Sequence, residues 1–238
     1  MMMLFRASLA LMLSLPIAGQ AMAQESTPAP ALELWAGHQV VIGSRPLPVL
    51  GDLETRSESF LLAEVERAGD TIVLKQRACR FAFKKVLGVS VEMSPQTIAR
   101  LPRSTLRFAR SPDGSYRAGP WTVSWGEEDI DRDGHPGATV QVSSSMCSGT
   151  IYTASEVRTS ARATLTAEDA LQGTVDVLNR ERVIDTSEWC LGAGSKGKLE
   201  KQQGWFRYVR VDPNTTCASL ARGPWPVKAQ VAGGSGGK

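Results

Sequence analysis

The chain has 238 residues, of which 42% are hydrophobic and 21% charged, and its formal net charge is +3. These proportions are typical of a soluble globular protein, and they exclude a coiled coil, a collagen, a wholly disordered chain and a polytopic membrane protein. So small a net charge gives no electrostatic reason to expect a nucleic-acid partner.

The first 23 residues have the three regions of a secretory signal peptide. Arg6 is the single charge ahead of a mostly apolar run over residues 7–17, and the small residues Ala21 and Ala23 form a cleavage site. We therefore expect cleavage after Ala23 and export to the periplasm or beyond. No later run is long and apolar enough to span a bilayer, so we expect no transmembrane segment in the mature chain.

The mature chain is predicted to be one β-rich domain with short unstructured ends. Residues 24–30 are expected to form a flexible leader, and residues 232–238 a disordered, glycine-rich tail. Residues 31–231 show no clear linker and are predicted to form a single domain, with 31–158 and 159–231 as its halves if it divides.

Apolar and polar residues alternate along most of this domain, which is the period of a strand with one buried face. The alternation predicts strands near residues 33–42, 56–66, 70–81, 86–93, 106–108, 121–125, 137–145, 151–157, 172–184 and 204–211. Helical signals are short. Ser94 can cap a helix that starts at Pro95 and stops before Pro102, and further short helices are predicted at 166–173 and 214–223. The fold class predicted is all-β: an antiparallel, lipocalin-like β-barrel or a sandwich, with short peripheral helices.

Four cysteines, Cys79, Cys147, Cys190 and Cys217, are predicted to form two disulfides in an oxidising compartment. They allow three pairings. We favour Cys79–Cys147 with Cys190–Cys217, because each of these pairs falls within one half of the chain. The sequence has no C-x-x-C motif and no zinc-type spacing.

The segment with most chemistry in it is rich in aspartate. Asp129, Asp131 and Asp133 occupy alternate positions and Gly134 follows, as in the first half of a calcium-binding loop. The carbonyl of His135 would be the backbone ligand at the seventh position. We expect a calcium site here; the alternative is a polar loop whose charges face water.

The second half of the loop departs from the EF-hand pattern. Gly137 stands at the ninth position and Val140 at the twelfth, where the pattern places a bidentate glutamate. Glu127 and Glu128, just upstream, could complete the ligand shell. With ligands missing, the expected affinity is weak, on the order of 10⁻⁴–10⁻³ M.

Residues 129–137, the strand after them and the Cys147-x-Gly149-x-x-Tyr152 segment resemble a group of uncharacterised secreted proteobacterial proteins. Such proteins carry a D-x-D-G-D-G-x-P-G-x-T loop ahead of C-x-G-x-x-Y, and here Arg132 replaces the more usual glycine. The resemblance implies an exported β-rich protein and supplies no activity. A vaguer similarity to lipocalin-like barrels rests on Trp35 before Gly37 and on a late cysteine near a short helix.

Catalytic signals are few. His38 lies in an apolar, strand-like run and is expected to be a half-buried strand residue, and no G-x-S-x-G or H-E-x-x-H motif is present. A hydrolase with paired carboxylates would have to draw on acids such as Glu64, Glu66, Glu127 and Glu128.

Two further groups of residues suggest binding. Six tryptophans could line a ligand cavity, although packing in the core is the favoured interpretation; they are Trp35, Trp121, Trp125, Trp189, Trp205 and Trp225. A basic cluster near Cys79 could contact an anionic envelope component, although a solvated strand face is favoured; it comprises Arg77, Arg80, Lys84 and Lys85.

The leading hypothesis is therefore an exported, non-catalytic protein with a calcium loop and a structural or binding role. A carrier of a small apolar ligand is the first alternative, and a carboxylate-dependent hydrolase is the second.

Overall fold

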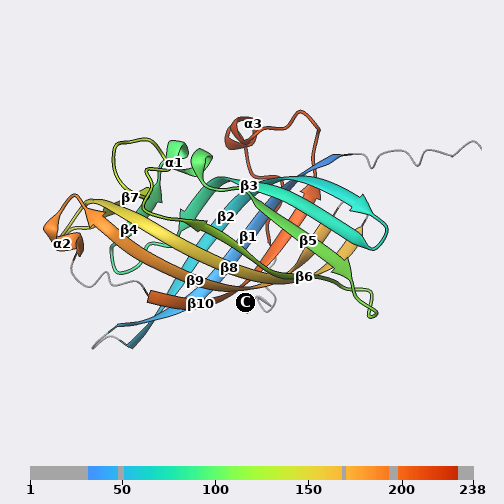
Figure 1. Cartoon of the computed structure of the whole chain (residues 1–238), viewed down its shortest axis with the longest axis horizontal. Coiled ribbons are helices and arrows are strands. Elements are labelled where there is room, and N and C mark those ends of the chain that lie inside the picture. The colour runs from blue at the N-terminus through green and yellow to red at the C-terminus, as the bar shows by residue number, and fades with distance from the viewer. Residues whose placement is uncertain (1–31, 48–50, 168–169, 193–197, 230–238) are drawn as a thin grey trace, which may run out of the picture.

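Antiparallel strands make up most of the part of the chain that the structure, a computed structural model, describes: residues 32–47, 51–167, 170–192 and 198–229 (Figure 1). The strands are β1 (Glu33–Leu47), β2 (Gly51–Ala68), β3 (Thr71–Phe83), β4 (Ser90–Met93), β5 (Ser104–Arg110), β6 (Tyr116–Trp125), β7 (Ala138–Ser143), β8 (Gly149–Ala167), β9 (Ala170–Thr186) and β10 (Lys198–Arg210). Three short helices accompany them: α1 (Pro95–Arg100), α2 (Trp189–Gly192) and α3 (Cys217–Ala221). The predicted signal peptide, leader and tail lie outside the described residues.

The strands form one sheet that closes on itself. Its order is β4-β7-β8-β6-β5-β3-β2-β1-β10-β9, and β9 pairs again with β8. Every pairing is antiparallel, and strands that are neighbours in the ring mostly follow one another in the chain. The fold is thus an all-β antiparallel barrel, which was one of the two architectures predicted.

One edge of β8 is shared between two partners. β6 pairs with residues 155–163 of β8 and β7 pairs with residues 149–153, while β9 runs along the opposite edge. β4 in turn pairs with β7. Between β3 and β8, the barrel wall therefore consists of β5 and β6 at one end and of β4 and β7 at the other, with α1 between the two parts (Figure 1).

Apolar side chains fill the interior at the β5–β6 end. The largest fully buried members of this core are Trp35, Ile72, Leu74, Phe108, Leu171 and Tyr208. Gly37 makes part of this packing possible, because a Cβ atom at that position would overlap the ring of Tyr208. The outward face of β3 carries polar residues such as Lys75 and Arg77, whereas the outward faces of β1 and β2 carry buried apolar residues, among them Ala36, Val40 and Leu62.

The four cysteines form two disulfides, but not in the favoured pairing. Cys79 bonds to Cys217 and Cys147 to Cys190, so the predicted Cys79–Cys147 and Cys190–Cys217 pairs are wrong. The prediction assumed that the two halves of the chain pack separately. Instead, closing the barrel brings α3 to β3, and it brings the start of β8 to α2.

Two of the predicted helices are present and one is not. The side chain of Ser94 caps α1 by accepting from the Thr97 N–H, and Thr216 caps α3. The helix predicted at 166–173 is wrong: β8 continues to residue 167, and β9 begins at residue 170. The chain instead reverses here as the β8–β9 hairpin, in which Leu165 pairs with Leu171, and this pairing overrides the capping signal. Among the described residues, none of the helices has the length and hydrophobicity that a membrane span requires.

The chain after β10, residues 211–229, is termed here the C-terminal segment, and it covers the outer face of β1 and β2. The Trp225 indole N–H donates to the Gly37 carbonyl at 3.0 Å, and Val227 is buried. The Trp225 ring meets Phe60 edge-on, 5.3 Å between centroids. This contact and the Cys79–Cys217 bond hold the segment against the barrel.

Candidate functional site

The aspartate loop, residues 127–137, connects β6 to β7 and brings three carboxylates together. One oxygen from each of Asp129, Asp131 and Asp133 lies within 4.8 Å of the others, a spacing that could hold a metal ion. Three residues bend the backbone through the left-handed region: Arg132 has φ of 58°, Gly134 has φ of 90° and Gly137 has φ of 78°.

Asp131 is the structural centre of this loop and is only 1% exposed. Its Oδ2 accepts from the Thr97 hydroxyl of α1 at 2.8 Å and from the Thr139 N–H of β7 at 3.0 Å. Its carbonyl accepts from the Gln96 side chain at 3.0 Å. Its Oδ1, by contrast, is buried and has no hydrogen-bond partner in the described part of the chain. A buried carboxylate oxygen without a donor is costly, and a cation would satisfy it.

The other two aspartates point their oxygens at backbone donors. Asp129 accepts from the N–H groups of Asp133 at 3.2 Å and Gly134 at 2.9 Å. Burial acts to raise the pKa of Asp129, but these N–H donors outweigh it, so the pKa lies below its ordinary value. Asp133 accepts from the His135 N–H at 3.0 Å. The group therefore offers carboxylate oxygens, the donor type that a hard divalent cation prefers.

The remaining predicted ligands are placed differently from the three aspartates. The His135 ring stacks on Tyr152, with 4.3 Å between centroids. The Glu127 carboxylate forms an ion pair with Arg182 at 2.5 Å. Glu128 contributes its carbonyl, which accepts from the Gly137 N–H at 3.1 Å. None of these three side chains belongs to the carboxylate group that could hold a metal ion.

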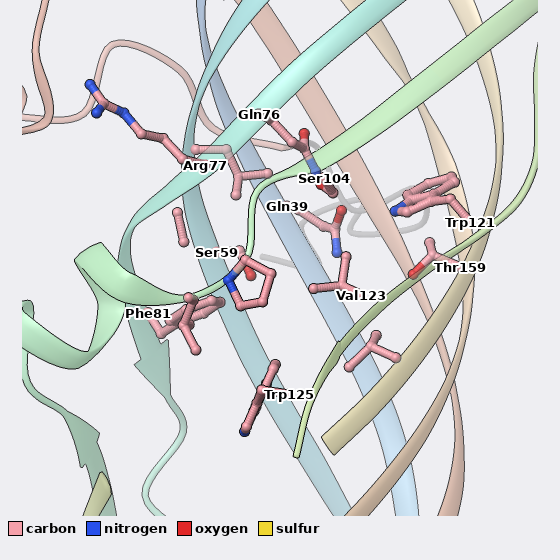
Figure 2. A pocket seen from close by; sticks show the side chains of 15 residues that line it. Gln39, Ser59, Gln76, Arg77, Phe81, Ser104, Trp121, Val123, Trp125 and Thr159 are labelled. Atoms are coloured by element: carbon pink, nitrogen blue, oxygen red, sulfur yellow. The ribbon is translucent and has the colours of Figure 1, made fainter. Parts of the chain in front are cut away.

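A second candidate site lies inside the barrel, from its middle to the β4–β7 end. Two adjoining cavities have volumes of about 190 and 220 Å³, and Figure 2 shows the smaller one. They share part of their lining: Gln39, Ser59, Phe81, Leu101, Trp125, Val157 and Thr159. The interior is thus packed at one end of the barrel and hollow at the other.

Only two of the six tryptophans line these cavities. Trp121 and Trp125 project from β6 into the smaller one (Figure 2). Trp35 belongs to the core, Trp225 to the C-terminal segment, and Trp189 is 89% exposed. The sixth, on the outer face of β10, is Trp205.

The polar lining of the cavity was not identified from the sequence. Gln39 follows Trp35 and Gly37 on the inward face of β1, and Gln76 follows Ile72 and Leu74 on that of β3. A glutamine that interrupts an otherwise apolar face is the signal that could have found both. Such a signal is weak in one sequence, because inward and outward faces are known only once the register is known.

His38 is a strand residue, and it is more deeply buried than predicted, at 5% exposure. Its Nδ1 accepts from the Ala229 N–H at 2.8 Å, and its Nε2 lies 3.1 Å from Glu58. Because Nδ1 acts as an acceptor, the ring is neutral and Nε2–H donates to Glu58. Burial lowers the pKa of His38 more than Glu58 raises it. This histidine links the C-terminal segment to β1 and β2.

The charged residues considered for catalysis or envelope binding are engaged in separate contacts. Glu66 pairs with Lys75 at 2.7 Å, while Glu127 pairs with Arg182 far along the chain. In the basic cluster, the Arg80 guanidinium lies over the Phe60 ring at 3.9 Å, and Lys84 pairs with Glu54 at 3.1 Å. Arg80 and Lys84 of this cluster thus contact different neighbours.

No family model and no curated protein matches the sequence. Among solved structures, that of Neisserial surface protein A aligns with a TM-score of 0.44 and 8% sequence identity. The alignment covers 75% of this chain and 97% of that chain. So loose a similarity carries no argument about function, and the fold assignment rests on the strand pairing.

Proposed function

We propose that the protein is an exported, non-catalytic binding protein that carries a small, largely apolar ligand inside its barrel. The supporting observation is the hollow end of the interior, where Trp121, Trp125 and Phe81 border adjoining cavities instead of filling them. Protein interiors are normally packed without such space, and concave apolar pockets with a few polar groups are the usual sites for small ligands. Two disulfides support a location outside the cytoplasm.

Filling the cavity tests this function. Ser59 lines both cavities from β2, so Ser59→Phe should occupy the space that a ligand needs. Thr174→Phe is the matched control, because Thr174 is exposed on the outer face of β9. Tryptophan fluorescence with naphthalene-sized aromatic probes should show saturable binding to the wild type and the control, and none to Ser59→Phe. Equal binding by all three proteins would place the probe outside the barrel and contradict the proposal.

We infer a second function, calcium binding by the aspartate loop, with Asp129, Asp131 and Asp133 as side-chain ligands. The observation that favours it is the buried, partnerless Oδ1 of Asp131 beside two further carboxylates. The role is structural, because Asp131 bonds to both α1 and β7. The His135 carbonyl is the proposed backbone ligand. With Glu127 paired to Arg182, the site is short of ligands, which supports a weak affinity on the order of 10⁻⁴–10⁻³ M.

Thermal unfolding measures this binding. If Kd is about 10⁻³ M, 10 mM calcium should add about 1.4 kcal/mol to the free energy of unfolding. The melting temperature should then rise by about 3–5 °C. Asp133→Ala should abolish the rise, whereas Asp70→Ala, which removes an exposed carboxylate elsewhere, should retain it. A wild-type melting temperature that calcium leaves unchanged would exclude the site.

A further inference from the structure

The smaller cavity has a polar wall and an apolar wall that face each other. Gln39 on β1 and Gln76 on β3 form the polar side, while Trp121, Val123 and Trp125 on β6 form the apolar side (Figure 2). Two sides of such different character would select a ligand by its chemistry and not by size alone.

Gln76 is held in one orientation by the core beneath it. The hydroxyl of Tyr208 donates to the Gln76 Oε1, and Tyr208 is fully buried. Burial raises the pKa of Tyr208, so the phenol stays protonated and remains a donor. Gly37 leaves the room that the Tyr208 ring needs. Because the amide oxygen is engaged, the amide NH₂ of Gln76 is left as a donor to the cavity.

Other polar groups lie around this donor. Gln39, Ser59 and Thr159 line both cavities, and within the described residues no protein group hydrogen-bonds to their side chains. Gln39 lines the same cavity as Trp121 and Val123 (Figure 2). A ligand in this space therefore meets neutral donors and acceptors from β1, β2 and β3, and one further hydroxyl, that of Thr159, beside Trp121.

Few charged residues border this space. Arg77 is the charged residue in the lining of the smaller cavity, and its guanidinium points away from the other labelled side chains (Figure 2), while Glu181 lines the adjoining cavity. In the smaller cavity, an anionic ligand would lose its hydration without gaining a counter-ion, which disfavours its binding. The volume of about 190 Å³ suits a molecule of one or two fused rings.

From these features we propose that the cavity recognises a neutral, planar one- or two-ring compound that carries a hydrogen-bond acceptor on one edge. The ring lies against Trp121, Val123 and Trp125, and the acceptor receives the Gln76 NH₂. This inference rests on the proposed carrier function, and it names the class of ligand carried. Gln76 is the residue that determines specificity, and Tyr208 positions it.

Three probes of similar shape test the proposal by isothermal titration at pH 7.5. Quinoline is neutral and has a ring acceptor, naphthalene has none, and 2-naphthoate is an anion. Quinoline should bind at least about tenfold more tightly than naphthalene, since an apolar analogue leaves the Gln76 donor unsatisfied. 2-Naphthoate should show no measurable binding.

Variants of the polar side of the cavity test whether Gln76 causes the preference for quinoline over naphthalene. Gln76→Leu should weaken quinoline binding to the level of naphthalene and leave naphthalene binding unchanged or stronger. If that variant does not fold, Gln39→Leu and Thr159→Val replace it in the experiment. At least one of them should reduce the ratio of quinoline affinity to naphthalene affinity. Gln203→Leu, on the outer face of β10, is the control and should retain it.

The outcomes separate the two proposals. If naphthalene, quinoline and 2-naphthoate bind the wild type equally well, the ligand class is wrong while the carrier function stands. If quinoline is preferred but every cavity variant keeps that preference, Gln76 does not recognise the acceptor and the inference fails. If none of the three probes binds the wild type, both the ligand class and the carrier function are contradicted.

Discussion

Arg132 has a backbone conformation that residues with a Cβ atom rarely adopt. Its φ of 58° lies in the left-handed region, which costs roughly 1–2 kcal/mol for most L-residues. Arg132 thus adds strain to a loop that already gathers three carboxylates.

Arg132→Gly should relieve this strain and raise the free energy of unfolding by up to about 1 kcal/mol, after the entropy cost of glycine is subtracted. Arg132→Ala is the matched control: it removes the same charge but keeps a Cβ atom, so it should not stabilise. Urea denaturation measures both. A glycine variant that is no more stable than the alanine variant would contradict the strain argument.

His38 makes the attachment of the C-terminal segment depend on pH. Protonating the ring would put a hydrogen on Nδ1, which accepts from the Ala229 N–H. Burial lowers the pKa of His38 in the folded state, so the unfolded chain binds the proton more readily. This contribution to stability is fully present above the unfolded pKa of about 6.5 and is lost as pH falls through the lower, folded value.

We therefore predict that the free energy of unfolding decreases as pH falls below about 6.5, with the C-terminal segment becoming susceptible to protease first. His38→Gln should flatten this dependence, because an amide can both accept from Ala229 and donate to Glu58 without titrating. The pKa of Glu58 is lowered, against the effect of its burial, by hydrogen bonds from Arg56 and His38, so its protonation acts at lower pH. A glutamine variant with the wild-type slope would assign the effect to other groups.

At the scale of the element, the two disulfides are expected to contribute unequally. Cys79–Cys217 joins residues 138 apart in sequence, and Cys147–Cys190 joins residues 43 apart. Chain-entropy arguments give roughly 5 and 4 kcal/mol for loops of these sizes. The larger loop also ties the C-terminal segment to the barrel.

Replacing Cys79 and Cys217 together by alanine should thus lower the free energy of unfolding by about 1 kcal/mol more than replacing Cys147 and Cys190. Guanidinium denaturation of the two double variants measures the difference, and a reversed ranking would show that native strain outweighs loop entropy.

Most strands could be predicted from sequence, because a period of two is a local property of the chain. The helix at 166–173 was predicted wrongly because its capping residues signal a helix start, whereas the chain reverses there and Ala163 pairs with Gly173 across the β8–β9 hairpin. The disulfide pairing failed for a different reason, since the contact between α3 and β3 exists only after the barrel has closed.

The candidate sites show the same division. The three aspartates are neighbours in sequence, so the group was predicted, but the burial of Asp131 depends on α1, more than 30 residues earlier. The polar side of the cavity combines Gln39 of β1 with Gln76 of β3, and it could not be predicted without the strand register. The alternation of inward and outward residues was visible, but not which inward residues would face one another.

For the whole molecule, closure of the ring depends on close approach of the β8 and β9 backbones. A Cβ atom on Gly173 would overlap the carbonyl of Arg162 and lie 2.7 Å from the Ala163 Cα. Gly173→Ala should therefore separate the strands and lower the free energy of unfolding by about 2–3 kcal/mol. Gly119→Ala is the control, because no atom lies within 4 Å of the added methyl. A thermal melt should distinguish them, and equal melting temperatures would contradict this account of closure.

The disulfides also affect how the molecule can mature. In chain order, the first cysteine bonds to the last and the second to the third, so the pairs are nested. A chain that enters an oxidising compartment from its N-terminus exposes Cys79 and Cys147 first, and bonding these two would trap a non-native loop. Native pairing must wait for Cys217 or be recovered by thiol–disulfide exchange. The yield of native protein should consequently depend on a disulfide isomerase, and an oxidant acting alone should favour misbridged forms.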